Sequence, residues 1–344
     1  MHFPPCNAGR QRGAALIVAL LVFALCTALI VAMKSEFTRF YQRGANLFLS
    51  EQANAYLQGA EELASLALLL DYDQDQGREQ PRDDLGEIWA QPAAPYALDE
   101  GGWLAGGLTD LAGRFNLNSL LAPSRSDDSP GQGAARFTPA QAQFIRLLQT
   151  LEEPQVSQQE AILITESIGD WLDPDGNPSP DGAEDDYYFG RSPAYRTANR
   201  PMASVSELRA VAYMTPEIYG ALRDLVTVWP QTPGLINIHT APEPVLRSIN
   251  ADDDLTPLSG ADGQALLRQR EESGFVDIED FLSQPVFAER REKMEKVQSL
   301  LGEASTCFLL EAQVEVADRN MRLYSVLERK QRSVTALVRA AGSL

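Results

Sequence analysis

The densest group of side chains capable of chemistry is an acidic stretch between residues 170 and 190, which reads DWLDPDGNPSPDGAEDDYYFG. Asp173, Asp175 and Asn177 have the alternating spacing of the first oxygen ligands of an EF-hand, and Glu184 takes the twelfth place counted from Asp173. Pro178 stands where an EF-hand requires glycine, so the loop is not an EF-hand. Carboxylates crowded between glycines and prolines still suit a hard cation such as calcium, because the cation offsets their mutual repulsion.

The alternative interpretation of this stretch is a solvated acidic loop, which short runs of like charge usually form. Trp171 and the aromatic run 187–189 flank the acids, and this favours a packed loop. A zinc site is not expected, because His239 and Cys307 are isolated nitrogen and sulfur ligands. A second acidic run, 252–254, is predicted to be a solvated loop or a helix cap.

The sequence offers little for catalysis. It contains no nucleophile elbow, zinc-protease motif, phosphate-binding loop or dinucleotide fingerprint, and His239 is the one histidine outside the amino-terminal leader. The carboxylates crowd into one loop instead of facing one another across a cleft, as a glycosidase would need. We therefore predict no enzyme, and the alternative is a membrane-anchored periplasmic enzyme that works through carboxylates.

The composition also bears on nucleic-acid binding. The segments LINIHTAPEPVLRSI and GQALLRQREESGFVDIEDFL look like a helix-hairpin-helix repeat, which often binds DNA. The chain of 344 residues carries a formal charge of −19, which repels phosphate backbones. A DNA-uptake protein would need a basic face that the sequence lacks. We interpret the repeat as a structural unit in which Asn237 and Thr240 cap backbone groups at the turn.

These segments must be positioned by a chain that begins with an uncharged run from Ala14 to Met33. Twenty helical residues span roughly 30 Å, the thickness of a bilayer core. Arg10 and Arg12 precede the run, so the positive-inside rule places the amino terminus in the cytoplasm and the remainder in the periplasm. A cleaved secretory signal is the alternative, but its apolar region is usually shorter and ends in small residues, unlike IVAMKSEF.

The helical pattern continues beyond the apolar run. Aromatic and aliphatic residues recur at steps of three and four from Phe37 to Phe48, and no proline occurs between Pro5 and Pro81. The pattern predicts one helix over about 14–70, with a membrane-spanning first half and an amphipathic second half. The acidic stretch that follows, 71–84, is predicted to be a loop.

The rest of the chain predicts an α+β fold. Residues 103–108 and 115–118 are expected to form two short strands around a turn, and 122–137 has the composition of a linker. Helices are expected over 138–151, 158–171, 204–213, 216–226, 241–249, 260–272 and 278–282. Alternating residues in FLLEAQVEVAD, MRLYSVLER and SVTALVRA predict an antiparallel sheet. The strands before and after the helical segment are expected to belong to one sheet.

A basic leader ending in Gly13, an apolar helix and an amphipathic extension resemble the amino terminus of type IV pilins and pseudopilins. That family usually has glutamate at the fifth mature residue, where this chain has Val18. Absence of this acid is typical of the minor pseudopilin K class of type II secretion systems. A helical domain that interrupts a pilin-like α+β domain also resembles that class, although a generic membrane anchor is the alternative for the apolar run alone.

The resemblance implies a leader at 1–13, a helix at 14–70 with a transmembrane segment at 14–33, a pilin-like domain at 71–122 and 303–344, and a helical insertion at 123–302. It implies that a prepilin peptidase cleaves between Gly13 and Ala14 and methylates Ala14. It also implies calcium, because GAEDDYY and the segment after it resemble the calcium-binding region of this class. Residue by residue, the candidate ligands are Asp173, Asp175, Asn177, Glu184, Asp185 and Asp186.

The implied function is structural. A protein of this class caps or initiates the pseudopilus tip and supports export of folded exoproteins across the outer membrane. The expected partners are the minor pseudopilins I and J, with H and the major pseudopilin G as further candidates, and no nucleic acid. The expected location is the inner membrane, with a single pass, a cytoplasmic amino terminus and a periplasmic soluble domain.

Overall fold

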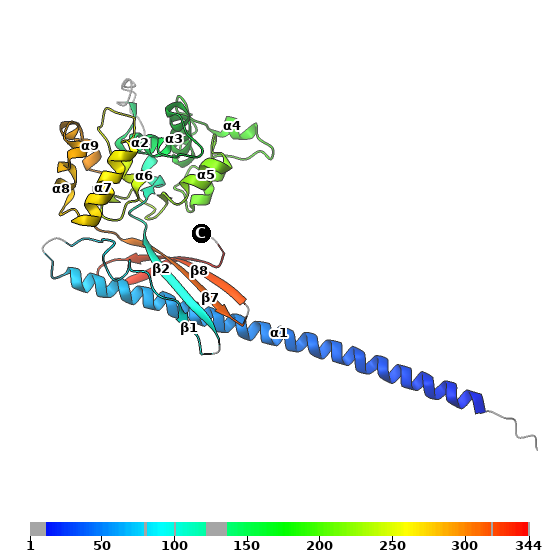
Figure 1. Cartoon of the computed structure of the whole chain (residues 1–344). Helices are drawn as coiled ribbons and strands as arrows, with labels where there is room; N and C mark the ends of the chain where they lie inside the picture. Colours follow the sequence, from blue (N-terminus) through cyan, green and yellow to red (C-terminus); the bar gives the residue numbers. More distant parts are fainter. Residues whose placement is uncertain (1–11, 79–80, 100, 122–135, 318, 343–344) are drawn as a thin grey trace, which may run out of the picture.

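The computed structural model describes residues 12–78, 81–99, 101–121, 136–317 and 319–342, so leader residues 1–11 and linker residues 122–135 lie outside the described residues. Helix α1 (Arg12–Asp75) is continuous over 64 residues. Its first half projects away from the rest of the molecule (Figure 1). The side chains of residues 14–44 are exposed, and the mean hydropathy of the most apolar stretch is 3.0. By length and composition, this helix can cross a membrane.

The second half of α1 packs on the sheet. Its buried side chains recur at steps of three and four, as Ala53, Leu57, Ala64 and Leu68 show. They form one core with strand residues such as Phe308. The predicted helix is confirmed, but it continues to Asp75, so residues 71–75, predicted as loop, are its last turns. The same buried stripe continues through them, and packing on the sheet extends the helix.

The sheet has five strands in the order β1-β2-β7-β8-β9, and every neighbouring pair is antiparallel. The strands are β1 (Tyr96–Ala97), β2 (Gly102–Asp110), β7 (Cys307–Val316), β8 (Arg319–Arg329) and β9 (Val334–Ala340). Strand β2 precedes the helical segment and pairs with β7, which follows it. The prediction that strands from both sides form one sheet is confirmed.

The two strands predicted at 103–108 and 115–118 are present, but they do not pair with each other. Strand β2 runs along β7 in a nine-residue register from Gly102 to Asp110, and this pairing occupies its inner edge. Strand β3 (Phe115–Asn116) instead pairs in parallel with β4 (Val226–Thr227). Phe115 lies in the core of the helical part, which the family resemblance had placed from residue 123 onward. Burial of the Phe115 side chain in this core, rather than the adjacent turn, determines which strand β3 pairs with.

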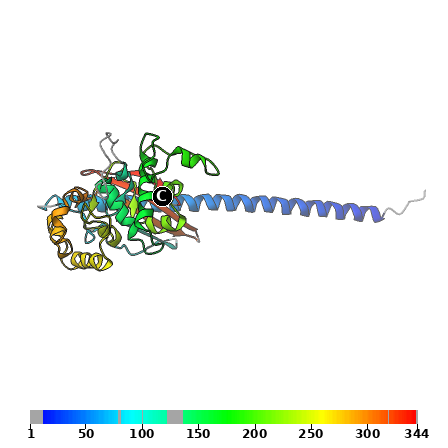
Figure 2. The same ribbon diagram turned by 90° about the horizontal axis from the view of Figure 1, so that it is seen from above.

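The helical part lies at the end of the sheet where β2 ends and β7 begins, above the second half of α1 (Figures 1 and 2). Its helices are α2 (Pro139–Gln149), α3 (Gln158–Leu172), α4 (Asp185–Phe189), α5 (Pro216–Leu222), α6 (Glu243–Arg247), α7 (Gly260–Glu272), α8 (Ile278–Ser283) and α9 (Glu295–Gln298). Short 3₁₀ helices cover Leu117–Leu120, Val205–Ala210, Pro285–Phe287 and Arg291–Lys293. Strand β5 (Ile236–Asn237) pairs in parallel with β6 (Leu301–Gly302).

Side-chain caps mark several helix starts in the helical part. Thr138 caps α2 through a reciprocal capping box with Gln141, and Pro139 opens the helix. Ser204 and Glu207 form a capping box, but the element that follows is a 3₁₀ helix ending at Ala210 rather than the predicted helix to residue 213. The helix predicted over 216–226 ends at Leu222, because Val226 belongs to β4.

Candidate functional site

The acidic stretch begins on the last turn of α3 with a buried carboxylate, Asp170. The backbone N–H of Ser179 donates to both of its oxygens, at 3.1 and 3.0 Å. A Cβ atom at Gly182 would lie 1.9 Å from Asp170 Oδ2, so only glycine permits this close approach. Burial raises the pKa of Asp170. The loop is therefore folded back tightly onto the end of α3.

Glu184, the N-cap residue of α4, is the second buried acid of this loop. Its side chain is 4% exposed, and Oε2 accepts hydrogen bonds from the Asp185 N–H and the Thr197 hydroxyl, both at 3.1 Å. Oε1 is buried and has no hydrogen-bond partner in the part of the chain that the structure describes. Burial raises the pKa of Glu184, and the carboxylates of Asp170 and Asp173 raise it further. An unpartnered buried oxygen next to like charges is the environment that a cation would relieve.

Asp173 is the third acid of this group. It follows α3 as the C-cap residue, and burial raises its pKa to about 6, with additional contributions from Asp175 and Asp170. Asp170 raises the pKa of both Asp173 and Glu184, so the three carboxylates act on one another electrostatically, but among the described residues they do not all lie within 4.8 Å of one another. Oxygen donors alone, one of them orphaned, fit a hard cation such as calcium.

The other predicted ligands lie at the rim. Asp175, Asn177 and Asp186 are exposed, and Asp175 Oδ1 accepts from the Asn177 N–H at 2.8 Å. Asp185 is partly buried, and its Oδ1 accepts from the backbone N–H and the hydroxyl of Thr197, both at 3.1 Å. Sequence reasoning did not include Asp170 among the ligands, although its place one helical turn before Asp173 was a usable signal.

Aromatic side chains pack the acidic loop against the helical core. The rings of Trp171 and Tyr188 meet edge to face with centroids 5.5 Å apart, and Tyr188 lies 5.2 Å from Tyr195. The Tyr188 hydroxyl accepts from the backbone N–H of Ala212 at 3.1 Å. These contacts anchor the loop to the helical core, as the flanking aromatics predicted.

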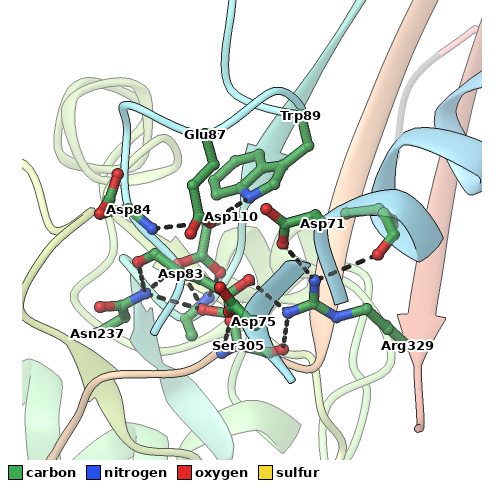
Figure 3. Close-up of polar contacts among 12 residues, drawn as sticks. Asp71, Asp75, Asp83, Asp84, Glu87, Trp89, Asp110, Asn237, Ser305 and Arg329 are labelled. Atoms are coloured by element: carbon green, nitrogen blue, oxygen red, sulfur yellow. Dashed lines mark hydrogen bonds and ion pairs between the residues drawn. The ribbon is translucent and has the colours of Figure 1, made fainter. Parts of the chain in front are cut away.

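A second acidic group lies where α1, the sheet and the helical part meet (Figure 3). We call it the acidic junction, defined by Asp71, Asp75, Asp83, Glu87 and Asp110 together with Arg329. Arg329, on β8, donates to Asp71 at 2.8 Å and also to Asp83. Arg78 pairs with Asp75 at 2.8 Å and with Glu87 at 2.7 Å. Two arginines thus face five buried carboxyl groups.

The junction reaches the helical part through Asp110 at the end of β2. Asp110 accepts hydrogen bonds from Asn237 Nδ2 at 3.1 Å, from the Ser305 hydroxyl at 2.7 Å and from the Thr240 hydroxyl. Asn237 also accepts from the backbone N–H of His239 at 3.0 Å, so its predicted capping role is confirmed. The same role predicted for Thr240 is wrong, because its hydroxyl bonds the Asp110 carboxylate.

Burial raises the pKa values of Asp71 and Asp83, because their ion pairs with Arg329 offset it only in part. Burial and the nearby Glu87 carboxylate raise the pKa of Asp71 to about 7, and burial raises the pKa of Asp83 to about 6 despite Arg329. Asp71, Asp75 and Glu87 each place an oxygen within 4.8 Å of the others. Among the described residues this is the one group of three such side chains that meets this spacing, and its members already form ion pairs with Arg78 and Arg329. Sequence reasoning missed it, because residues 71–84 were interpreted as a polar loop.

Comparisons with known proteins agree over nearly the whole chain. Two family models described as "Type II secretion system (T2SS), protein K" match residues 113–231 and 236–301. Proteins named type II secretion system protein K are similar in Pectobacterium carotovorum (31% identity, 97% of each chain), Klebsiella pneumoniae (32%, 97% of each) and Pseudomonas aeruginosa PAO1 (33%, 96% of this chain and 93% of the relative).

A solved structure is also similar. It is the crystal structure of the GspK-GspI-GspJ complex from the type 2 secretion system of enterotoxigenic Escherichia coli. One of its chains matches with a TM-score of 0.73 and 28% identity, over 88% of this chain and 100% of that chain. The fold of most of this chain thus occurs in a solved relative, and the chain belongs to the type II secretion system protein K family.

Proposed function

We propose that this chain caps and initiates the tip of the pseudopilus and so supports export of folded exoproteins across the outer membrane. One observation carries the proposal: the helical part lies over the second half of α1, at the end of the molecule away from its projecting first half (Figure 2). In a fibre built from parallel α1 helices, this mass occupies the space that a further subunit would need. Val18 supports the same position, since an acid there would pair with a subunit above it.

The proposed partners at the tip are the minor pseudopilins I and J. Support comes from the similar solved chain, which is part of a GspK-GspI-GspJ complex. The pseudopilins H and G are the proposed neighbours below, and the exposed apolar half of α1 is the surface that would enter the helical bundle.

We place the chain in the inner membrane, with residues 14–33 crossing it once, the amino terminus in the cytoplasm and the rest in the periplasm. The exposed, uncharged surface of this stretch supports the span, and Arg10 and Arg12 support the orientation. A prepilin peptidase would cleave between Gly13 and Ala14 and methylate Ala14. Intact mass with and without co-expressed peptidase tests this, and a mature form that begins beyond Met33 would refute it.

A calcium ion is the proposed ligand of the acidic loop, held by Asp170, Asp173 and Glu184. The orphaned oxygen of Glu184 and the raised pKa values of these acids support it. When bound, calcium supplies positive charge that offsets the repulsion within the loop and fixes its shape. Asp175, Asn177, Asp185 and Asp186 remain candidates for completing the oxygen shell.

A structural role, rather than an enzymatic one, is the better interpretation. The family is a component of a secretion system, and acids of the acidic junction are paired with arginines while the others discussed above are gathered in one loop. The proposed mechanism is assembly and packing.

The test of tip capping is the position of the subunit in the fibre. The Leu111 N–H donates to the Cys307 carbonyl at 3.0 Å, so a short turn can join residue 111 to residue 306 and remove the helical part. Asp110→Asn in the same variant removes the carboxylate that would lose its partners. Immunogold labelling of a tag on the wild-type chain should mark one fibre end, whereas the excised variant should occur at several positions. Wild-type label along the fibre would refute the proposal.

A further inference from the structure

A cleft lies between the helical part and the outer face of the sheet, with a volume of about 570 Å³. The turn after β2 contributes Arg114, the helical part contributes Arg209, Tyr219 and Arg223, and β7 and β8 contribute Glu311 and Tyr324. It is remote in sequence from the acidic loop, and the proposed tip function does not use it. Three arginines in one cleft contrast with a chain whose formal charge is −19.

Arg114 distinguishes this cleft from an ordinary surface groove. It is partly buried, yet its guanidinium forms no hydrogen bond or ion pair within the ranges that the structure describes. Every other arginine in the described ranges that is partly or fully buried donates at least one hydrogen bond. Arg146 donates to backbone carbonyls, for example, and Arg329 donates to carboxylates. None of the Arg114 nitrogens is among the fully buried atoms without a partner, so the guanidinium still reaches water and keeps its donors available to an anion that enters the cleft.

The electrostatics agree with this geometry. Burial lowers the pKa of Arg114, and the carboxylates of Asp224, Glu311 and Asp110 offset this only in part. Arg209 lies over the ring of Tyr219, with 5.9 Å between its guanidinium carbon and the ring centroid, and Arg223 is exposed beside Asp224. Of the three arginines that line the cleft, Arg114 alone has neither a ring nor a carboxylate in contact within the described ranges.

The lining selects among anions. Asp224 and Glu311 would repel a dianion such as phosphate more strongly than a single negative charge. The aromatic side chains of Tyr219, Trp229 and Tyr324 offer apolar contact beside the guanidinium groups. A planar carboxylate can accept two parallel hydrogen bonds from Arg114, which suits this fork geometry.

We propose that this cleft binds a carboxylate group of another polypeptide, carried next to an apolar or aromatic residue. An acidic side chain and a chain terminus present the same chemistry, and both would place a negative charge against Arg114. Because the lining comes from the helical part and from the sheet, the bound group would contact both.

The test uses the full chain in detergent and ligand-observed NMR titrations. N-acetyl-phenylalanine should bind with a dissociation constant on the order of 1 mM, and its neutral amide at least tenfold more weakly. The α-amide of N-acetylglutamate carries only a side-chain carboxylate, so its affinity relative to the first probe identifies the source. Arg114→Gln should weaken carboxylate binding about tenfold. Arg268→Gln, an exposed arginine of α7 outside the cleft, is the matched control and should leave it unchanged.

A second variant, expected to change carboxylate affinity in the opposite direction, tests the proposal if Arg114→Gln does not fold. Glu311→Gln removes a repelling charge and should strengthen carboxylate binding about twofold. Equal affinity for the acid and its amide, no effect of either cleft substitution, or tighter binding of inorganic phosphate than of both carboxylates would each overturn the proposal.

Discussion

Replacing Arg329 by methionine should destabilise the protein strongly, because it leaves two buried carboxyl groups without their cation. Arg329 donates to Asp71 at 2.8 Å and to Asp83, whose side chains are 2% and 1% exposed as residues. Removing one partner of a buried ion pair costs about 3–5 kcal/mol of unfolding free energy, because the other charge stays buried. We expect a loss of this size for Arg329→Met at pH 8.

The loss should depend on pH in a defined direction. Burial raises the folded-state pKa of Asp71 to about 7 and of Asp83 to about 6, above the ordinary value of 3.8. The folded protein therefore binds more protons than the unfolded chain between about pH 4 and pH 7, and these groups stabilise the fold less as pH rises through that window. At pH 5 both acids are largely neutral in the folded state, so the variant should lose only roughly 2 kcal/mol.

Arg332→Met is the matched control. Arg332 pairs with Asp73 at 3.0 Å, but the two side chains are 76% and 39% exposed. Such a pair contributes about 0–1 kcal/mol. Urea unfolding of the full chain in detergent, followed by tryptophan fluorescence, measures all three proteins at pH 5 and pH 8. A loss for Arg329→Met that is equal at both pH values, or no larger than that of the control, would refute the reasoning.

Three further predictions concern separate parts of the chain. Gly182→Ala should displace Asp170 and abolish any rise in melting temperature that calcium gives the wild type over an EDTA control; an unchanged rise would exclude this loop as the site. Glu61→Gln should lose about 1 kcal/mol at pH 7, because Arg339, which donates to it and lowers its pKa, is largely exposed. That loss should shrink as pH falls below 4.5, the ordinary pKa of Glu61, and a pH-independent difference in urea midpoints would contradict it. Thr138→Ala should cost about 1 kcal/mol through loss of the α2 cap, whereas no change in thermal unfolding would show that the cap contributes nothing.

Much of the fold was readable from local patterns. The uncharged run, the period of the amphipathic extension and the alternation in β7 each depend on neighbouring residues, so the sequence predicted them directly. The pairing of Phe115 with the helical part was not readable, because β3 and β4 meet across more than a hundred residues of chain. Only packing in a shared core determines that partner, and no local signal encodes it.

The acidic junction shows why a buried acid is hard to predict. Buried positions of α1 recur at steps of three and four through Leu57, Glu61, Ala64, Leu68, Asp71 and Asp75. Three of these residues are acids, so their residue types predict a polar surface or a loop. Their spacing of three and four residues, in contrast, predicts that they face the core. The spacing was the better predictor of burial, because helix geometry decides which side chains share one face. In the acidic loop, residue type and spacing alone drew attention to Asp173 and Glu184, and their role as ligands stays a prediction.

The same stripe explains why the junction is ionic. Hydrophobic residues at Asp71 and Arg329 would pack as well and avoid the cost of desolvating charge, so these pairs are weak evidence for stability. They do impose geometry: Arg329 reaches Asp71 and Asp83 together only when α1, β8 and the 81–89 segment hold one relative position. Asp110 extends this constraint to Asn237 in the helical part. The junction therefore joins helix, sheet and helical part through one connected set of hydrogen bonds.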